Sequence, residues 1–147
     1  MGGSVREQRT VPGWEHFHHV ADIGVRGYGH SPAEAFEQAA LSLSAVSVDL
    51  DRIIPRTCIE IRCTAPDYEL LLVDWLNALI YEMAVRSMIF ARFAVRLSDQ
   101  NLNGQAWGER VEVARHAPAV EVKGATYTAL QVAEEGGVWV AQCVVDV

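Results

Sequence analysis

Two stretches of the chain carry apolar residues at the three- and four-residue spacing of a helix that buries one face. The first follows Ser31, a suitable N-cap, with proline next in the chain and Glu34 placed to complete a capping box. Its apolar stripe runs through residues 36–46, so the pattern predicts an amphipathic helix that ends near Val48. The second stretch, residues 67–86, predicts another such helix, with a stripe formed by Leu72, Leu76, Leu79, Ile80 and Met83.

Other segments alternate apolar and polar residues, or are rich in β-branched and aromatic residues, as strands are. The glycines at positions 24, 27 and 29 are compatible with a strand where a bulge or a close backbone approach requires them. A turn of two glutamates and two glycines at 134–137 predicts that the last strand forms a hairpin with the segment before it. The predicted strand segments are 14–29, 57–64, 90–97, 102–113, 120–123, 127–132 and 138–147.

The order of these elements is strand, helix, strand, helix and then a run of strands, which predicts an α+β fold. We expect two amphipathic helices packed on one face of a mixed, largely antiparallel β-sheet. The length of 147 residues suits a single domain, and an apolar content of 50% excludes a disordered chain. We expect residues 1–13, which are polar and end in Pro-Gly, to be a flexible tail and residues 14–147 to form the domain.

The charge balance of 12 basic against 19 acidic residues gives a net charge of −7. Most nucleic-acid binders carry a basic face that neutralises phosphates, so strong direct binding to RNA or DNA is not expected. The three cysteines contain no C-x-x-C pair and are expected to be reduced, which suits a cytoplasmic protein. The sequence begins without a signal peptide, and no apolar run is long enough to span a membrane.

One candidate metal site lies near the N-terminus. His16, His18 and Asp22 would share a face if this segment were one continuous strand, and two histidines with a carboxylate can bind a transition metal. Asp22 has apolar neighbours, so its charge calls for a partner or a metal. The alternative is that the histidines are solvated and that Asp22 belongs to a turn.

A second candidate lies at the end of the sequence. Asp146 and the α-carboxylate of Val147 would repel each other, and a hard divalent cation relieves such repulsion. Lys123 lies in a strand-like stretch beside a glycine and could bind a phosphate as a point charge. The alternatives are a frayed chain end and a solvated lysine.

A series of fragments, in a fixed order from about residue 15 onward, resembles the archease family. Each fragment alone is weak, and the ordered set is specific. The fragments are His19-Val20-Ala21-Asp22-Ile23-Gly24, the helix starts at 31–40 and 67–77, Gly108-Glu109, Arg115-His116, the segment 121–127 and the final Val144-Val145-Asp146-Val147. Two positions depart from the family pattern: Val20 replaces a threonine, and His18 replaces a frequent aspartate.

The resemblance implies an accessory protein that activates an RtcB-type RNA ligase in tRNA splicing and RNA repair. Such proteins promote the GTP-dependent guanylylation of the ligase's active-site histidine and allow multiple turnovers. The family's metal site falls on Asp22, Asp146 and Val147, and its functional lysine falls on Lys123. Calcium is the expected ion, with magnesium or manganese as alternatives, and GTP and RNA are met only through the ligase.

Two other functions stay open at this point. A metal-dependent phosphoesterase would use His16, His18 and Asp22 and would turn over substrate by itself. A chaperone-like interaction module would bind its partner without any metal. The sequence holds no complete catalytic set, so we expect no stand-alone catalysis.

Overall fold

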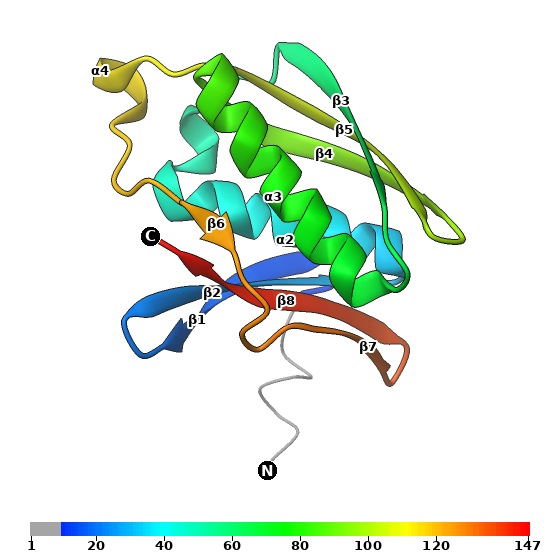
Figure 1. Cartoon of the computed structure of the whole chain (residues 1–147). Coiled ribbons are helices and arrows are strands. Elements are labelled where there is room, and N and C mark those ends of the chain that lie inside the picture. Colours follow the sequence, from blue (N-terminus) through cyan, green and yellow to red (C-terminus); the bar gives the residue numbers. More distant parts are fainter. Residues whose placement is uncertain (1–9) are drawn as a thin grey trace.

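The computed structural model describes residues 10–147, and it has two antiparallel sheets with two long helices between them (Figure 1). The helices are α2 (Pro32–Ser47) and α3 (Tyr68–Arg86). Helix α2 contacts strands of both sheets, and so does α3. The apolar core therefore lies in the helical layer and on the inner faces of the two sheets.

The larger sheet joins the two ends of the described chain. Its strands are β1 (Gly13–His19), β2 (Asp22–Gly29), β8 (Val138–Asp146) and β6 (Gly124–Ala125), in that order, and β7 (Gln131–Glu135) also pairs with β8. All these pairs are antiparallel. The second strand of the chain thus lies directly against the last one.

The smaller sheet has the order β3-β5-β4, with β3 (Thr57–Thr64), β5 (Asn101–Arg110) and β4 (Met88–Ser98). Two short helical segments lie outside the layers: the 3-10 turn η1 (Leu50–Arg52) and α4 (Val113–His116). The sheet has one covered face, because apolar and polar positions alternate along β3 and β5.

Both long helices begin at a side-chain cap, and the cap at Ser31 is the predicted one. The amide of Glu34 donates to Ser31 Oγ at 3.1 Å, and Asp67 accepts from the amide three residues further on at 2.8 Å. The Glu34 carboxylate bonds the amide of the residue before Ser31, at 2.7 Å, instead of closing the box on Ser31 itself. Within residues 10–147, neither helix combines the length and the apolar character needed to cross a membrane.

The side chain of Trp75 joins α3, α2 and the smaller sheet. It is fully buried, and its indole N–H donates to the Phe36 carbonyl oxygen of α2 at 3.1 Å. Its ring meets Phe93 of β4 edge-on at 6.1 Å between centroids. On β5 it covers Gly104, where a Cβ atom would lie 2.5 Å from the indole ring.

The α+β class and the two predicted helices are confirmed, but the expectation of a single sheet covered on one face is wrong. The strands divide into two sheets, and the helices are buried on two sides. The physical reason is visible in α3, whose buried residues include Leu71, Leu72, Val73 and Trp75, positions that spread over more than one face of the helix. The predicted tail, residues 1–13, lies mostly outside the described residues, and β1 begins at Gly13.

Three predicted strands also need correction. Residues 14–29 form a hairpin of two strands, not one continuous strand. Residues 120–123 are not a strand, because only 124–125 pair with β8. The hairpin partner of the last strand is present, although it spans Gln131–Glu135 and not 127–132.

Close approach of α2 explains two of the three glycines in β2: a Cβ atom on Gly29 would lie 2.5 Å from the backbone nitrogen of Ala35, and the approach at Gly27 is closer still. A Cβ atom on Gly27 would lie 2.2 Å from the backbone nitrogen of Ala39 and 2.4 Å from the carbonyl oxygen of Ala35, both in α2. No side chain fits at such distances, so α2 can lie on the sheet only because this position is glycine. The expectation of a close backbone approach is confirmed here.

We expect Gly27→Ala to lower the free energy of unfolding by about 2 kcal/mol or more, because the added methyl group must push α2 away from the sheet. Urea denaturation followed by circular dichroism measures this. The matched control is Gly124→Ala in the same sheet, whose Cβ would make only an ordinary contact at 3.7 Å. Equal stability of the two variants would contradict the close packing of α2 on β2.

Candidate functional site

The register of β2 against β8 brings Asp22 close to Asp146. Ile23 pairs with Val145 in this register, and both pack in the core. Asp22 is the first residue of β2 and Asp146 is the last of β8, so each lies one residue beyond that pair and the two are cross-strand neighbours. Because side chains alternate along strands, both aspartates lie on the sheet face that is turned away from the helices.

The other two predicted site residues lie beside these strand ends. The backbone nitrogen of Lys123 donates to the carbonyl oxygen of Asp146 at 2.8 Å, and Val147 directly follows Asp146. The Lys123 side chain is exposed, and it forms no salt bridge with any other described residue. The fold thus places Asp22, Asp146, Val147 and Lys123 together, and their functional roles stay a prediction.

The residues of the second metal hypothesis do not come together. The chain turns after His19, so the two histidines and Asp22 do not belong to one strand. His16 and His18 lie on the face of β1 toward α2, and His16 Nε2 is 2.8 Å from a backbone carbonyl oxygen of that helix. Among the side chains of residues 10–147, no group of three or more His, Cys, Asp or Glu could hold a metal ion. The two-histidine, one-carboxylate arrangement is therefore not formed.

The hairpin that carries Asp22 is strained and polar. Val20, at its tip, has a left-handed φ of 50° and is 82% exposed. A β-branched residue in this conformation costs about 1–3 kcal/mol. His19 pairs with Asp22 across the hairpin, and its buried Nδ1 atom has no hydrogen-bond partner among the described residues. An unsatisfied polar atom therefore lies beside Asp22.

The donor atoms around Asp22 and Asp146 suit a hard divalent cation. Both side chains supply carboxylate oxygens, and Val147, the residue after Asp146, supplies main-chain oxygen. Calcium takes six to eight oxygen ligands and magnesium about six, so two aspartates leave positions for water or for oxygens of a bound partner.

Asn77 of α3, whose role could not be expected from the sequence patterns, holds the short strand β6 that directly follows Lys123. Its Oδ1 accepts from the Ala125 amide at 2.8 Å, and its Nδ2 lies 3.4 Å from the Ala125 carbonyl oxygen. These two contacts replace a neighbouring strand on the side of β6 that faces away from β8. The signal in the sequence is an uncharged polar residue within the apolar part of a helix.

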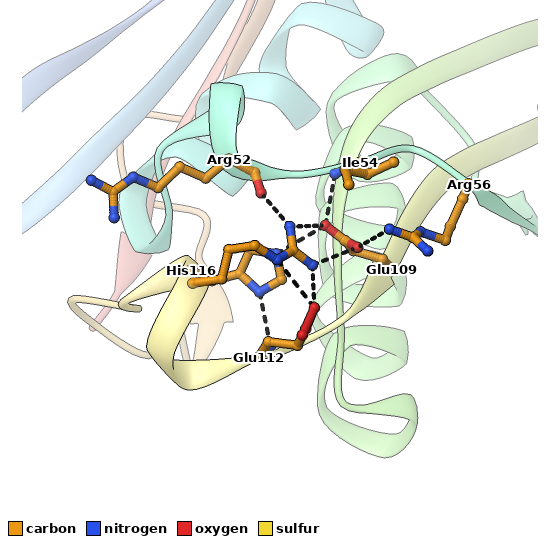
Figure 2. Close-up of polar contacts among 7 residues, drawn as sticks. Arg52, Ile54, Arg56, Glu109, Glu112 and His116 are labelled. Atoms are coloured by element: carbon orange, nitrogen blue, oxygen red, sulfur yellow. Dashed lines mark hydrogen bonds and ion pairs between the residues drawn. The ribbon is translucent and has the colours of Figure 1, made fainter.

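A buried carboxylate anchors the start of the segment that leads to Lys123 (Figure 2). Glu109, at the end of β5, is 5% exposed. It accepts hydrogen bonds from the Ile54 amide at 2.7 Å and from both terminal nitrogens of Arg115 at 2.8 and 2.9 Å. His116 Nε2 lies 2.9 Å from the same carboxylate, and Arg56 forms a longer ion pair with it at 3.3 Å. Helix α4 is thereby fixed to β5.

The tautomer of His116 follows from its two contacts. The Glu112 amide can only donate, and it lies 2.8 Å from His116 Nδ1, so Nδ1 must be the unprotonated nitrogen. Nε2 therefore carries the proton and donates it to Glu109. Glu112 also bonds the Arg115 guanidinium, which completes a network of two carboxylates around one arginine.

Hydrogen bonds from Arg115 hold the pKa of the Glu109 carboxyl far below its usual range, against burial, which alone would raise that pKa. The Ile54 amide and His116 lower it further. Glu109 therefore stays ionised throughout the neutral range and keeps the network charged.

The three cysteines are free, as expected. Burial raises the pKa of the Cys143 thiol to about 12, and burial with the nearby Asp74 charge raises that of Cys63 to about 11. Both thiols are therefore protonated at neutral pH and poor nucleophiles.

We expect Asn77→Ala to expose the amide of Ala125, because that N–H loses its acceptor. The exchange of this amide with solvent deuterium, measured by NMR, should become about fivefold faster, as for the loss of one hydrogen bond of about 1 kcal/mol. Tyr81→Phe, an exposed change one turn further along α3, is the control and should leave the exchange unchanged. Unaltered protection in Asn77→Ala would mean that β8 alone holds this edge.

We expect Glu109→Gln to destabilise the fold, and the loss should depend on pH. A carboxyl with a lowered folded-state pKa contributes stability that is complete above its unfolded pKa of about 4.3 and is lost as the pH falls toward the folded value. The difference in unfolding free energy between wild type and Glu109→Gln should therefore be largest near pH 7 and shrink below about pH 4. Chemical denaturation at several pH values measures it. A difference that does not change with pH would contradict the ionised network.

Comparisons with known proteins place the chain in one family. The family model "Archease protein family (MTH1598/TM1083)" matches residues 14–147. The protein archease of Pyrococcus furiosus is 37% identical over 139 residues, which are 91% of this chain and 98% of that protein. The protein archease of Sulfurisphaera tokodaii is 34% identical over 136 residues, with coverage of 91% and 98%.

Two solved structures share the fold. The solution structure of Methanobacterium thermoautotrophicum protein 1598 superposes with a TM-score of 0.80 at 29% identity, over 93% of this chain and 100% of that one. An archease from Thermotoga maritima, named as a possible chaperone, gives a TM-score of 0.55 at 20% identity, over 90% and 96%. With the match of the family model over nearly the whole domain, these likenesses show that the chain belongs to the archease family.

Proposed function

We propose that this protein activates an RtcB-type RNA ligase in tRNA splicing and RNA repair. It promotes the GTP-dependent guanylylation of the ligase's active-site histidine and allows multiple turnovers, and it has no catalysis of its own. The observation that carries the proposal is the β2–β8 register, which makes Asp22 and Asp146 neighbours although they lie at opposite ends of the chain. Membership of the archease family supports the same function.

Asp22, Asp146 and the main-chain oxygens of Val147 would hold a divalent cation, with calcium as the first candidate and magnesium or manganese as alternatives. When bound, the cation supplies positive charge that offsets the phosphates of a nucleotide. Lys123, which is exposed beside the end of β8, adds a further point charge for a phosphate. The hairpin tip beside Asp22 exposes Val20, which gives the ligase an apolar contact next to the charged site.

The partner is a larger protein that handles RNA. A net charge of −7 favours and speeds the encounter with a basic surface, and it opposes direct binding to nucleic acid. GTP and RNA are therefore met through the ligase, in the cytoplasm. The charge that matters is the local charge of Asp22 and Asp146, which lie together at the ends of the central strands β2 and β8.

The test is an assay of ligase guanylylation with GTP and a divalent cation, with and without this protein. Wild type should stimulate it, and Asp22→Asn and Asp146→Asn should each lose about tenfold or more of the stimulation, because an amide is a weaker ligand for a hard cation. Asp99→Asn is the matched control, since it removes the same charge at an exposed turn of the smaller sheet, between β4 and β5. The proposal fails if wild type does not stimulate or if all three variants stimulate alike.

A metal-independent chaperone-like module is the second candidate, favoured by the name of the Thermotoga maritima relative as a possible chaperone. It differs in its response to a chelator. Partner binding that persists in EDTA, with no calcium or magnesium heat in calorimetry, would support the chaperone and exclude a role for the cation. If the protein is a metal-dependent activator, Asp146→Asn should lose both the heat of cation binding and the binding to the partner.

A further inference from the structure

A cavity of about 370 Å³ lies between the end of α2, the C-terminal half of α3 and residues 118–122. Its lining is mostly apolar. Among its most buried lining residues, Met88 belongs to the main hydrophobic cluster and Ile89 to a smaller one around Val48 and Ile53. The cavity therefore lies between two parts of the core that do not merge, and its apolar wall is formed by residues of both parts.

One of the lining residues has a buried polar atom that forms no hydrogen bond with any described residue. Ser44 of α2 is 4% exposed, and its Oγ has no hydrogen-bond partner among residues 10–147. A buried serine in a helix often bonds the carbonyl oxygen one turn earlier, and Ser44 does not. Ser42, two residues before it, is fully buried and satisfied, since its Oγ donates to the Glu15 carbonyl oxygen at 2.8 Å and accepts from the Arg26 amide at 3.3 Å.

We propose that this cavity binds a small uncharged molecule with an apolar body and one hydroxyl group that pairs with Ser44 Oγ. The volume falls within the range of sites for small molecules, which are typically apolar with a few polar groups that fix orientation. A charged ligand is disfavoured by the apolar wall. The site uses neither Asp22 nor Asp146, so it stands independently of the proposed metal site.

The chain closes one side of the cavity itself. The Ala119 amide donates to the Ser47 carbonyl oxygen at 2.8 Å, which holds residues 118–122 against the end of α2. The same segment continues into Lys123, and its other end follows the network around Glu109. Both ends of this wall are thus fixed, and the cavity is preformed.

Phenol and toluene are the probes, because they have nearly the same size and differ by one hydroxyl group. Two of the three methionines, Met83 and Met88, line the cavity, so their methyl signals in an NMR spectrum of the full chain report on its occupancy. Phenol should shift both signals in a saturable way. Ser44→Ala should weaken phenol binding about fivefold, as for the loss of one hydrogen bond, and leave toluene binding unchanged.

Ser42→Ala is the matched control and should leave phenol binding as in wild type, because Ser42 does not line the cavity. Ser44→Leu should abolish the binding of both probes by filling the space, with thermal unfolding as the check that each variant is folded. Phenol binding that is insensitive to Ser44→Ala, or an equal loss for both probes, would overturn the hydroxyl-directed site. The absence of saturable methyl shifts in wild type would overturn the cavity as a ligand site.

Discussion

The antiparallel pairing of β2 with β8 joins the first and last parts of the described chain, and both the core and the candidate site depend on it. On the inner face, Val25 and Cys143 form a buried pair beneath α2. At the end of the same ladder, Asp22 and Asp146 become neighbours. A shift of this register by one residue would turn every side chain to the other face, so the core that fixes the register also fixes the aspartates.

Glycine and tryptophan positions set how the layers meet. Gly27 lets the backbone of α2 approach β2, and Trp75 fills the space over Gly104 and bonds α2. The helices are therefore shared by two sheets instead of covering one. Two contacts distant in sequence then hold the segment that contains Lys123: the Glu109 network before it, and Asn77 after it.

Features determined by local residues could be predicted, and non-local ones could not. The helices could be predicted because each has an apolar stripe at helical spacing, preceded in the first helix by the cap Ser31. The turn after His19 was missed because Val20 adopts a left-handed φ without glycine or asparagine to signal it. The division into two sheets depends on which strands pair with each other. The alternation of apolar and polar residues along a strand does not specify this pairing. The meeting of Asp22 with Asp146 was expected from the resemblance alone, and the partners of Asn77 and Glu109 are too distant in sequence for a local pattern to specify them.

The most direct measurement is a titration of the protein with Mn²⁺, a paramagnetic stand-in for a hard cation, followed by amide NMR spectra. If Asp22 and Asp146 form one site, substoichiometric Mn²⁺ should broaden the amides of residues 22–23, 123–124 and 145–147 first, since β2, β6 and β8 meet there. Calcium should reverse the broadening, and Asp22→Asn should prevent it. Broadening first at another acidic segment, such as residues 49–51, or none at the β2–β8 edge, would contradict a metal site held by this strand pair.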